Sequence, residues 1–237
     1  MGLGAAETGR TASDPLAPIR TAPGDRPFVV AQLGQSLDGR IATLSGESRW
    51  INKDAALDHV HRIRATVDAV VIGIGTVLAD DPMLNVRRVT GRNPARVVID
   101  SNGRLPASAR MLTDDGARRL VVRGRRLTTT HGCEVIEVAD GPDGLCPKAI
   151  VVALWQAGLK SLLIEGGART VSGFLDAGAV DRLHMLVAPV ILGSGKPGLT
   201  LDPITRLSQA LRPAASIHVL PDGDVLFDCD MRIAREG

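Results

Sequence analysis

Short runs of aliphatic residues recur along the chain and limit the folds available to it. The runs are continuous, without alternation of apolar and polar residues, which is typical of strands covered on both faces. Helical patterns separate several of them. Strands that alternate with helices indicate an α/β protein built on a mainly parallel sheet. The predicted strands are 28–33, 69–72, 96–99, 120–122, 135–138, 161–164 and 183–191, and the predicted helices are 54–65, 147–157 and 168–177.

The two ends of the chain differ from this pattern. Residues 217–220 and 224–230 flank a Pro-Asp-Gly turn and predict an antiparallel hairpin, so we expect a mixed sheet. Residues 1–26 are rich in Ala, Gly, Thr, Pro and Asp without hydrophobic periodicity, and we expect a disordered leader there. Residues 27–237 are then expected to form a single domain.

Composition narrows the classes of partner. The 237 residues carry a net charge of +2 with both signs mixed, and only 2% are aromatic, so neither a basic stripe nor stacking platforms for nucleic acid are present. No apolar run has the length of a membrane span or the form of a signal peptide, which favours a cytoplasmic protein. We expect no membrane partner, and a small molecule or a second copy of the chain as ligand.

Metal binding is not expected either. The three cysteines are far apart and form no C-x-x-C motif. His59 and His61 are two residues apart on a predicted helix, so they point to different sides and make poor zinc co-ligands. We interpret both histidines as structural.

Glycines follow two of the predicted strands. Gly73 and Gly75 open like a dinucleotide fingerprint, but Leu78 stands where the third glycine would be. Gly166 and Gly167 precede a clearer helix, whose first amides could bind an anion such as phosphate. A plain tight turn is the alternative for the second pair.

Arg64 is the most informative charged residue. On the helix predicted at 54–65, which Asn52 can cap, Arg64 projects between Leu57 and Val60 on the apolar face. A buried guanidinium needs a partner, because an unpaired buried charge is costly. An internal ion pair with Asp or Glu, a stem that snorkels to solvent, and a ligand phosphate all satisfy that need.

Several segments together resemble one family, the reductases of riboflavin biosynthesis. These are the dihydrofolate reductase-like domains found at the C-terminus of bifunctional RibD proteins and as separate enzymes in other lineages. The resemblance runs from about residue 28 to residue 230 and implies a dihydrofolate reductase-like sheet with flanking helices. It is carried by SLDGR (36–40), SGESRWI (45–51), HRIR (61–64), GTVLADDP (75–82), VIDS (98–101), IEGG (164–167) and AP (188–189).

The resemblance implies an activity. Members of the family use NADPH to reduce the ribosyl side chain of 5-amino-6-(5-phosphoribosylamino)uracil to the ribityl form, with hydride passing to C1′ of the opened sugar. Homodimers are common in the family. Alternatives are the same reduction on the 2,5-diamino-pyrimidinone, a pterin or dihydrofolate reduction, and a nucleotide-binding subunit without catalysis.

The family pattern also implies site residues. Asp80 and Glu165 would handle protons, although Asp80 could instead be a turn carboxylate and Glu165 the partner of a core arginine. Arg64 would bind the substrate 5′-phosphate with Arg87 and Ser48. NADPH would contact Gly34, Trp50, Thr76, Asp80, Ser101 and the Gly167 to Gly173 segment, including Ala168, Arg169 and Thr170, and substrate would contact Ser48, Arg64, Leu84, Arg87 and Glu165.

The chain departs from the family pattern in two respects. Gln32 is neutral where many bifunctional members carry Lys, so a contact to the sugar phosphate is missing. We also expect no deaminase domain, and the identity of the pyrimidine stays open. The absent third glycine after Gly73 and Gly75 is no departure, because the family does not use one.

Overall fold

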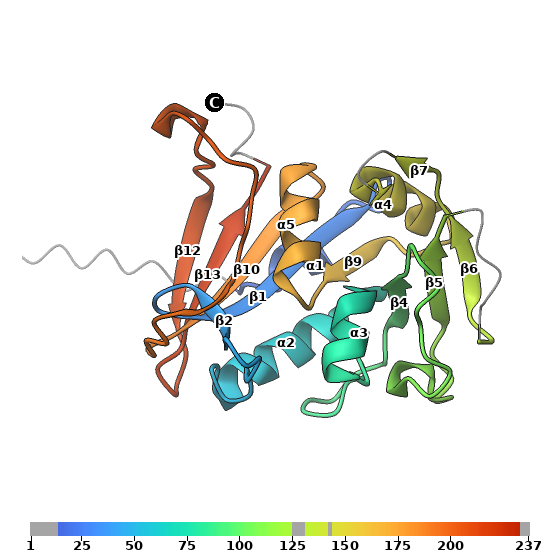
Figure 1. The fold of residues 1–237 in the computed structure, drawn as a ribbon, viewed down its shortest axis with the longest axis horizontal. Coiled ribbons are helices and arrows are strands. Elements are labelled where there is room, and N and C mark those ends of the chain that lie inside the picture. Colours follow the sequence, from blue (N-terminus) through green and yellow to red (C-terminus); the bar gives the residue numbers. More distant parts are fainter. Residues whose placement is uncertain (1–13, 125–130, 142–143, 233–237) are drawn as a thin grey trace, which may run out of the picture.

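A nine-stranded mixed sheet organises the molecule in the computed structural model, which describes residues 14–124, 131–141 and 144–232. The strand order is β12-β13-β10-β1-β9-β3-β4-β5-β6, from one side of Figure 1 to the other. Strands β10 to β6 pair in parallel, whereas β13 runs antiparallel to both of its neighbours. The strands are β1 (Phe28–Ser36), β3 (Ala69–Gly73), β4 (Ala95–Ile99), β5 (Arg119–Arg123), β6 (Glu134–Glu137), β9 (Ser161–Ile164), β10 (Arg182–Ala188), β12 (Ala214–Val219) and β13 (Val225–Asp230).

Helices and short ribbons complete the fold. Two small antiparallel pairs lie apart from the main sheet: β2 (Arg40–Thr43) with β11 (Gly195–Pro197), and β7 (Asp140–Gly141) with β8 (Gly144–Leu145). The helices are α1 (Ala17–Arg20), α2 (Asp54–Thr66), α3 (Ile74–Asp80), α4 (Pro147–Gln156) and α5 (Ala168–Asp176), with single 3-10 turns at Arg110–Leu112 and Leu207–Gln209.

Both faces of the sheet are covered, as the continuous apolar runs predict. Helices α4 and α5 supply the apolar side chains of one core, and α1, α2 and α3 those of the core on the opposite face. The central strands β3 and β9 are buried along nearly their whole length. Burial of both faces removes apolar surface from water on each side and stabilises the parallel sheet.

The structure confirms the α/β class, the mostly parallel sheet and the antiparallel C-terminal strands. Predicted and observed strands agree to within a few residues. The ribbon of β2 and β11 was not predicted, because strands of four and three residues carry too little pattern to be recognised.

The expected leader is wrong for residues 14–26, and its remaining residues lie outside the described part of the chain. Helix α1 forms there, and Leu16 and Ile19 are buried in the same core as Phe28. Two apolar residues three positions apart make one helical turn, which is too short to stand out as a periodicity.

The start of α2 also differs from the expectation. Lys53, rather than Asn52, is the N-cap, and its side chain makes no capping bond. The turn between β12 and β13 supplies the acceptors instead, because Asp224 accepts from the Lys53 amide at 2.8 Å and Asp222 from the Ala55 amide at 2.8 Å. These carboxylates satisfy amides that the helix leaves unpaired and suit its positive end.

Candidate active site

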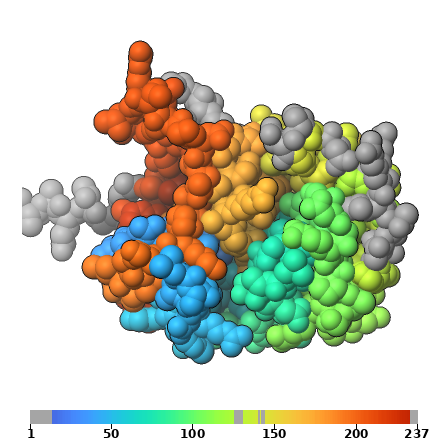
Figure 2. Space-filling view, viewed as in Figure 1, coloured from blue at the N-terminus to red at the C-terminus, as the bar shows by residue number. Residues whose placement is uncertain are grey.

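A cleft of about 1270 Å³ opens at the carboxyl ends of the central parallel strands. Parallel α/β sheets place their ligands at this edge. Strand β1, the loop that follows β2 and the residues that follow β3, β4 and β9 all contribute to its lining. In Figure 2 the light-blue loop before α2, the teal α3 and the light-orange α5 surround its mouth. The polar and glycine residues that follow the predicted strands in the sequence therefore line this cleft.

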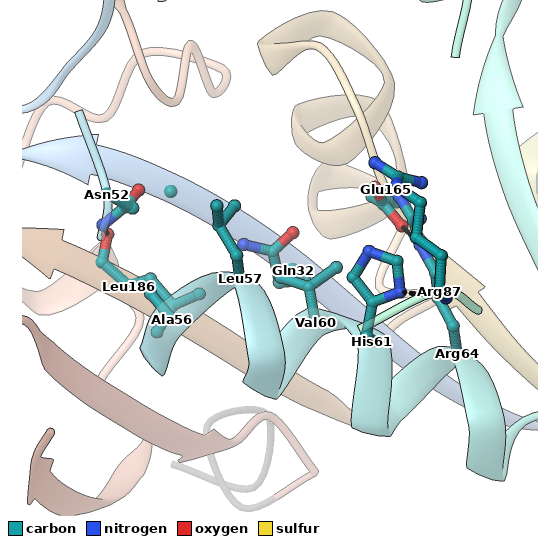
Figure 3. A pocket seen from close by; sticks show the side chains of 11 residues that line it. Gln32, Asn52, Ala56, Leu57, Val60, His61, Arg64, Arg87, Glu165 and Leu186 are labelled. Atoms are coloured by element: carbon teal, nitrogen blue, oxygen red, sulfur yellow. Dashed lines mark hydrogen bonds and ion pairs between the residues drawn. The ribbon is translucent and has the colours of Figure 1, made fainter. Parts of the chain in front are cut away.

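A second, smaller cavity of about 230 Å³ lies beside the cleft, along the side of α2 that faces β1 and β10 (Figure 3). Asn52 lies at one end of this cavity and Arg64 at the other. We call this cavity the inner compartment. The residues that line both cavities, and so form the boundary between them, are Gln32, Gly34, Asn52, Leu57, Arg87 and Glu165.

Arg64 forms a buried ion pair with Glu165. Arg64 Nε donates to Glu165 Oε2 at 2.9 Å, Nη2 donates to Oε1, and Nη1 donates to the Asn85 carbonyl at 3.1 Å. The two side chains are 7% and 15% exposed. The sequence left three possibilities open for Arg64. The structure contains the ion pair with an internal carboxylate, in the paired geometry that suits a guanidinium.

Arg87 differs from Arg64 in lacking a carboxylate partner among the described residues. Its Nη1 donates to Asn85 Oδ1 at 3.0 Å, and its side chain borders both cavities. Burial and the neighbouring Arg64 charge lower the pKa of Arg87 from its usual value. Two arginines and one glutamate leave one uncompensated positive charge at this end of the inner compartment, which favours an anion there.

His61 lines the inner compartment as a neutral side chain. Its Nδ1 accepts a hydrogen bond from the Arg87 amide at 3.2 Å. Burial, followed by the charges of Arg64 and Arg87, lowers its pKa from 6.5 to about 4. His61 thus holds the backbone of Arg87 in place without adding a charge to the site.

The Gly166–Gly167 turn lies against α3. The Gly167 amide donates to Thr76 Oγ1 at 3.0 Å, and Gly166 has a φ of 108°, which strongly favours glycine. A Cβ on Gly166 would lie 2.7 Å from Thr76 Oγ1, so a side chain there would collide. Thr76 and the two glycines therefore bring the starts of α3 and α5 together at the cleft.

Space and charge in the cleft suit an extended anionic ligand. A Cβ on Gly75 would meet nothing within 4 Å, so a ligand can approach this backbone closely. The lining contains five basic side chains against two acidic ones: Arg49, Arg87, Arg104, Arg169 and Lys196 against Asp80 and Glu165.

Most residues that the resemblance implied are brought together. Arg64 lines the inner compartment, and Leu84 and Ala168 line neither cavity. Leu84 is only 1% exposed and packs in the core beside α2, which argues against contact between its side chain and a ligand. Val171 and Ser172 of the Gly167 to Gly173 segment also line neither cavity. The others line the cleft: Gly34, Ser48, Trp50, Thr76, Asp80, Arg87, Ser101, Glu165, Gly167, Arg169, Thr170 and Gly173.

A buried polar network between α2 and strands β10 and β13 was not predicted from the sequence. His59 Nε2 lies 3.0 Å from His184 Nδ1, and His184 Nε2 lies 3.2 Å from Asp228 Oδ1. Arg182 binds both carboxylate oxygens of Asp228. Burial and the neighbouring His184 lower the pKa of His59 to about 3. The network borders neither cavity, so the structural interpretation of His59 stands, but His61 belongs to the site.

Residues 14–124, 131–141 and 144–232 contain neither a metal-binding cluster nor a membrane-spanning helix. His, Cys, Asp and Glu side chains nowhere gather into a group of three that could bind a metal ion. No helix in this part of the chain has both the length and the apolar character needed to cross a membrane.

Comparison with known proteins assigns the fold to a family. The model of the RibD C-terminal domain family matches residues 27–218. The chain belongs to the RibD C-terminal domain family. The solved structure of Acinetobacter baumannii RibD superposes with a TM-score of 0.74 at 32% identity, covering 86% of this chain and 58% of that one. The chain therefore has the fold of RibD C-terminal domains. This confirms the dihydrofolate reductase-like α/β fold that the resemblance implied.

Two kinds of relative differ in how much of their length is matched. The 2,5-diamino-6-ribosylamino-4(3H)-pyrimidinone 5′-phosphate reductase of Archaeoglobus fulgidus is 36% identical over 71% of this chain and 83% of that protein. The riboflavin biosynthesis protein RibD of Aquifex aeolicus is 33% identical over 72% of this chain and 49% of that protein. The chain thus spans about half the length of the RibD relatives it matches.

The pH dependence of stability tests the environment of His61. In the unfolded chain His61 takes up a proton near pH 6.5, whereas in the folded chain it does so only near pH 4. The free energy of unfolding should therefore fall as the pH is lowered from 6.5 to 4. The variant His61→Asn, which keeps an acceptor, should lose stability less steeply, by up to about 1.4 kcal/mol per pH unit in this window. Urea titrations across that range measure both slopes, and equal slopes would contradict the assignment.

Proposed function

We propose that the protein is an NADPH-dependent reductase of riboflavin biosynthesis, which reduces the ribosyl side chain of 5-amino-6-(5-phosphoribosylamino)uracil to the ribityl form. Family membership and the names of the relatives support the reaction class. The decisive structural observation is that a large cleft and an inner compartment with an available arginine share one boundary. A reduction between two bound ligands requires such a meeting point.

A second pyrimidine is supported by a specific observation. The archaeal relatives named for the 2,5-diamino-6-ribosylamino-4(3H)-pyrimidinone 5′-phosphate are matched over 83% and 90% of their length. The match thus covers most of the length of these proteins, whereas it covers about half of the RibD relatives. We therefore keep the diamino-pyrimidinone as the alternative substrate of the same reaction.

The residues of the cleft fit a dinucleotide. The open space beside Gly75, the Gly166–Gly167 turn and the excess of basic side chains suit a ligand with several phosphates. Arg104 and Arg169 offer charges for the additional phosphate that distinguishes NADPH from NADH. When bound, NADPH supplies the hydride. The Thr76 and Gly167 contact holds the backbone against which it would lie.

The inner compartment fits the phosphorylated sugar. We assign the 5′-phosphate to Arg87, because Arg64 already forms an ion pair with Glu165. Arg64 contributes positive charge next to the phosphate without binding it directly. Ser48, at the edge of the cleft, completes this anion site. With both Glu165 oxygens bound to Arg64, Asp80 is the carboxylate left to exchange a proton with the substrate.

We also propose that the protein acts as a cytoplasmic homodimer. Strand β12 is a terminal strand of the sheet, and its Ile217 and Val219 side chains are 62% and 75% exposed. Exposed apolar side chains on an edge strand favour pairing with another chain. Sedimentation equilibrium should give twice the chain mass for the wild type and the chain mass for Ile217→Asp with Val219→Asp. A monomeric wild type would contradict the proposal.

Turnover of the two pyrimidines tests the proposed reaction. Purified protein should oxidise NADPH in the presence of 5-amino-6-(5-phosphoribosylamino)uracil, followed by the loss of near-ultraviolet absorbance of the reduced nicotinamide. The same assay with the diamino-pyrimidinone ranks the two substrates by kcat/KM. A known reductase serves as positive control, and no oxidation with either compound while that control is active would refute the proposal.

Substitution of Arg87 tests the phosphate assignment. Arg87→Ala should raise KM for the phosphorylated substrate roughly tenfold or more, since a hydrogen bond to a charged group contributes about 1.5 to 3 kcal/mol. Its neighbour Arg88 pairs with Asp54 and Asp58 and lines neither cavity, so Arg88→Ala is a matched control with an unchanged KM. Equal KM values for both variants would place the phosphate elsewhere.

A further inference from the structure

Arg110 is an unpaired arginine close to the cleft but outside it. Many arginines away from the cleft bind a carboxylate, as Arg88, Arg92 and Arg182 do. Arg110 is exposed, lines neither cavity, and within residues 14–124, 131–141 and 144–232 its guanidinium binds no carboxylate. In that respect it is like the arginines that line the cleft and lack such a partner in the same ranges, which are Arg49, Arg87, Arg104 and Arg169.

Two contacts hold the backbone of Arg110 at the rim of the cleft. Arg110 begins the 3-10 turn that follows β4, and its amide donates to Asp81 Oδ1 at 2.7 Å. Asp81 is the C-cap of α3, whose last residue lines the cleft. The next residue, Met111, is fully buried in the core that also contains Leu84. In Figure 2 the green surface that follows β4 lies beside the teal α3. Arg110 is therefore fixed next to the segment that leads from α3 to Arg87.

The charge of Arg110 acts on the anion site from this position. Burial, then the charge of Arg64 and then that of Arg110, lowers the pKa of Arg87. Asp81 does not neutralise the guanidinium, because it binds the amide of Arg110 instead. An exposed charge attracts an oppositely charged ligand through water over about one Debye length, which is about 10 Å at 0.1 M salt. Arg110 thus extends the positive potential of the anion site outward to the rim.

We infer that Arg110 attracts the phosphorylated substrate toward Arg87 from outside both cavities, without contacting the bound ligand. This inference rests on the proposed function. The phosphate keeps its charge while hydride is transferred elsewhere in the substrate, so the attraction stabilises ground state and transition state equally. Removing the charge should therefore lower kcat/KM and leave kcat unchanged. Salt should abolish the difference, because it screens charges that do not touch.

Charge reversal at Arg110 has a matched control at the other edge of the sheet. Arg212 is also exposed and binds no carboxylate among the described residues, but it precedes β12, far from β4 and β5 (Figure 1). At about 10 mM salt Arg110→Glu should lower kcat/KM for the pyrimidine substrate roughly threefold or more, and Arg110→Gln should lower it less. Arg212→Glu should retain wild-type kcat/KM. At about 0.5 M salt all four proteins should have nearly equal values.

Three results would overturn the inference and leave the proposed function intact. The first is an equal kcat/KM for the wild type and Arg110→Glu at low salt. The second is a loss that persists at high salt, which would indicate direct contact with the ligand or a structural defect. The third is a lower kcat. Urea unfolding midpoints check the folding of each variant, and Arg110→Gln carries the comparison alone if Arg110→Glu does not fold.

A binding measurement decides the case in which the wild type reduces neither pyrimidine and the proposed function fails. Calorimetry uses ribose 5-phosphate as the probe at the same two salt concentrations. The wild type should bind it more tightly than Arg110→Glu at low salt, and the ratio of the two dissociation constants should approach one at high salt. Equal affinities at low salt, a ratio that salt does not change, or no binding by the wild type would overturn the inference.

Discussion

The ion pair between Arg64 and Glu165 joins the elements on which the site depends. It connects α2 to the turn after β9, and the third hydrogen bond of Arg64 fixes the Asn85 carbonyl, two residues before Arg87. Because both charges are buried, removing either partner would leave the other without compensation. The pair therefore fixes the end of the inner compartment and leaves Arg87, among the described residues that line it, as the cation available to a ligand.

The arrangement of the sheet explains why two cavities meet at this point. Parallel strands end at one edge, where the turns after β3 and β9 lie against each other through Thr76 and Gly167. Helix α2 covers the neighbouring part of the sheet, and its start is held by Asp222 and Asp224 from the turn before β13. Residues distant in sequence thus define the boundary at which the two ligands of the proposed reaction would meet. Preorganisation of this kind reduces the cost of bringing two ligands together.

Sequence patterns predicted the elements better than the contacts between them. The continuous apolar runs gave the order of strands and helices, because strands buried on both faces leave a clear signal. The angular position of Arg64 identified it as a buried charge. Its partner Glu165 lies 101 residues away, and no local pattern connects the two. Leu84 was implied by resemblance alone and lies in the core.

Other features could not be predicted from the sequence for a similar reason. Helix α1 contributes only Leu16 and Ile19 to the core, too few for a periodicity. The cap of α2 comes from a distant turn, although Asn52 is a favourable residue at the local position. In each case, tertiary contacts decide what local preference leaves open.

Transfer of an isotope from the cofactor to the substrate is the direct test of the proposed hydride transfer. The protein would be incubated with the phosphoribosylamino-pyrimidine and NADPH that carries deuterium at both C4 positions. The proposed reaction should give a ribityl product with one deuterium at C1′, detected by mass spectrometry and located by NMR. A ribityl product without deuterium at C1′, or NADPH oxidised with the sugar unchanged, would contradict it.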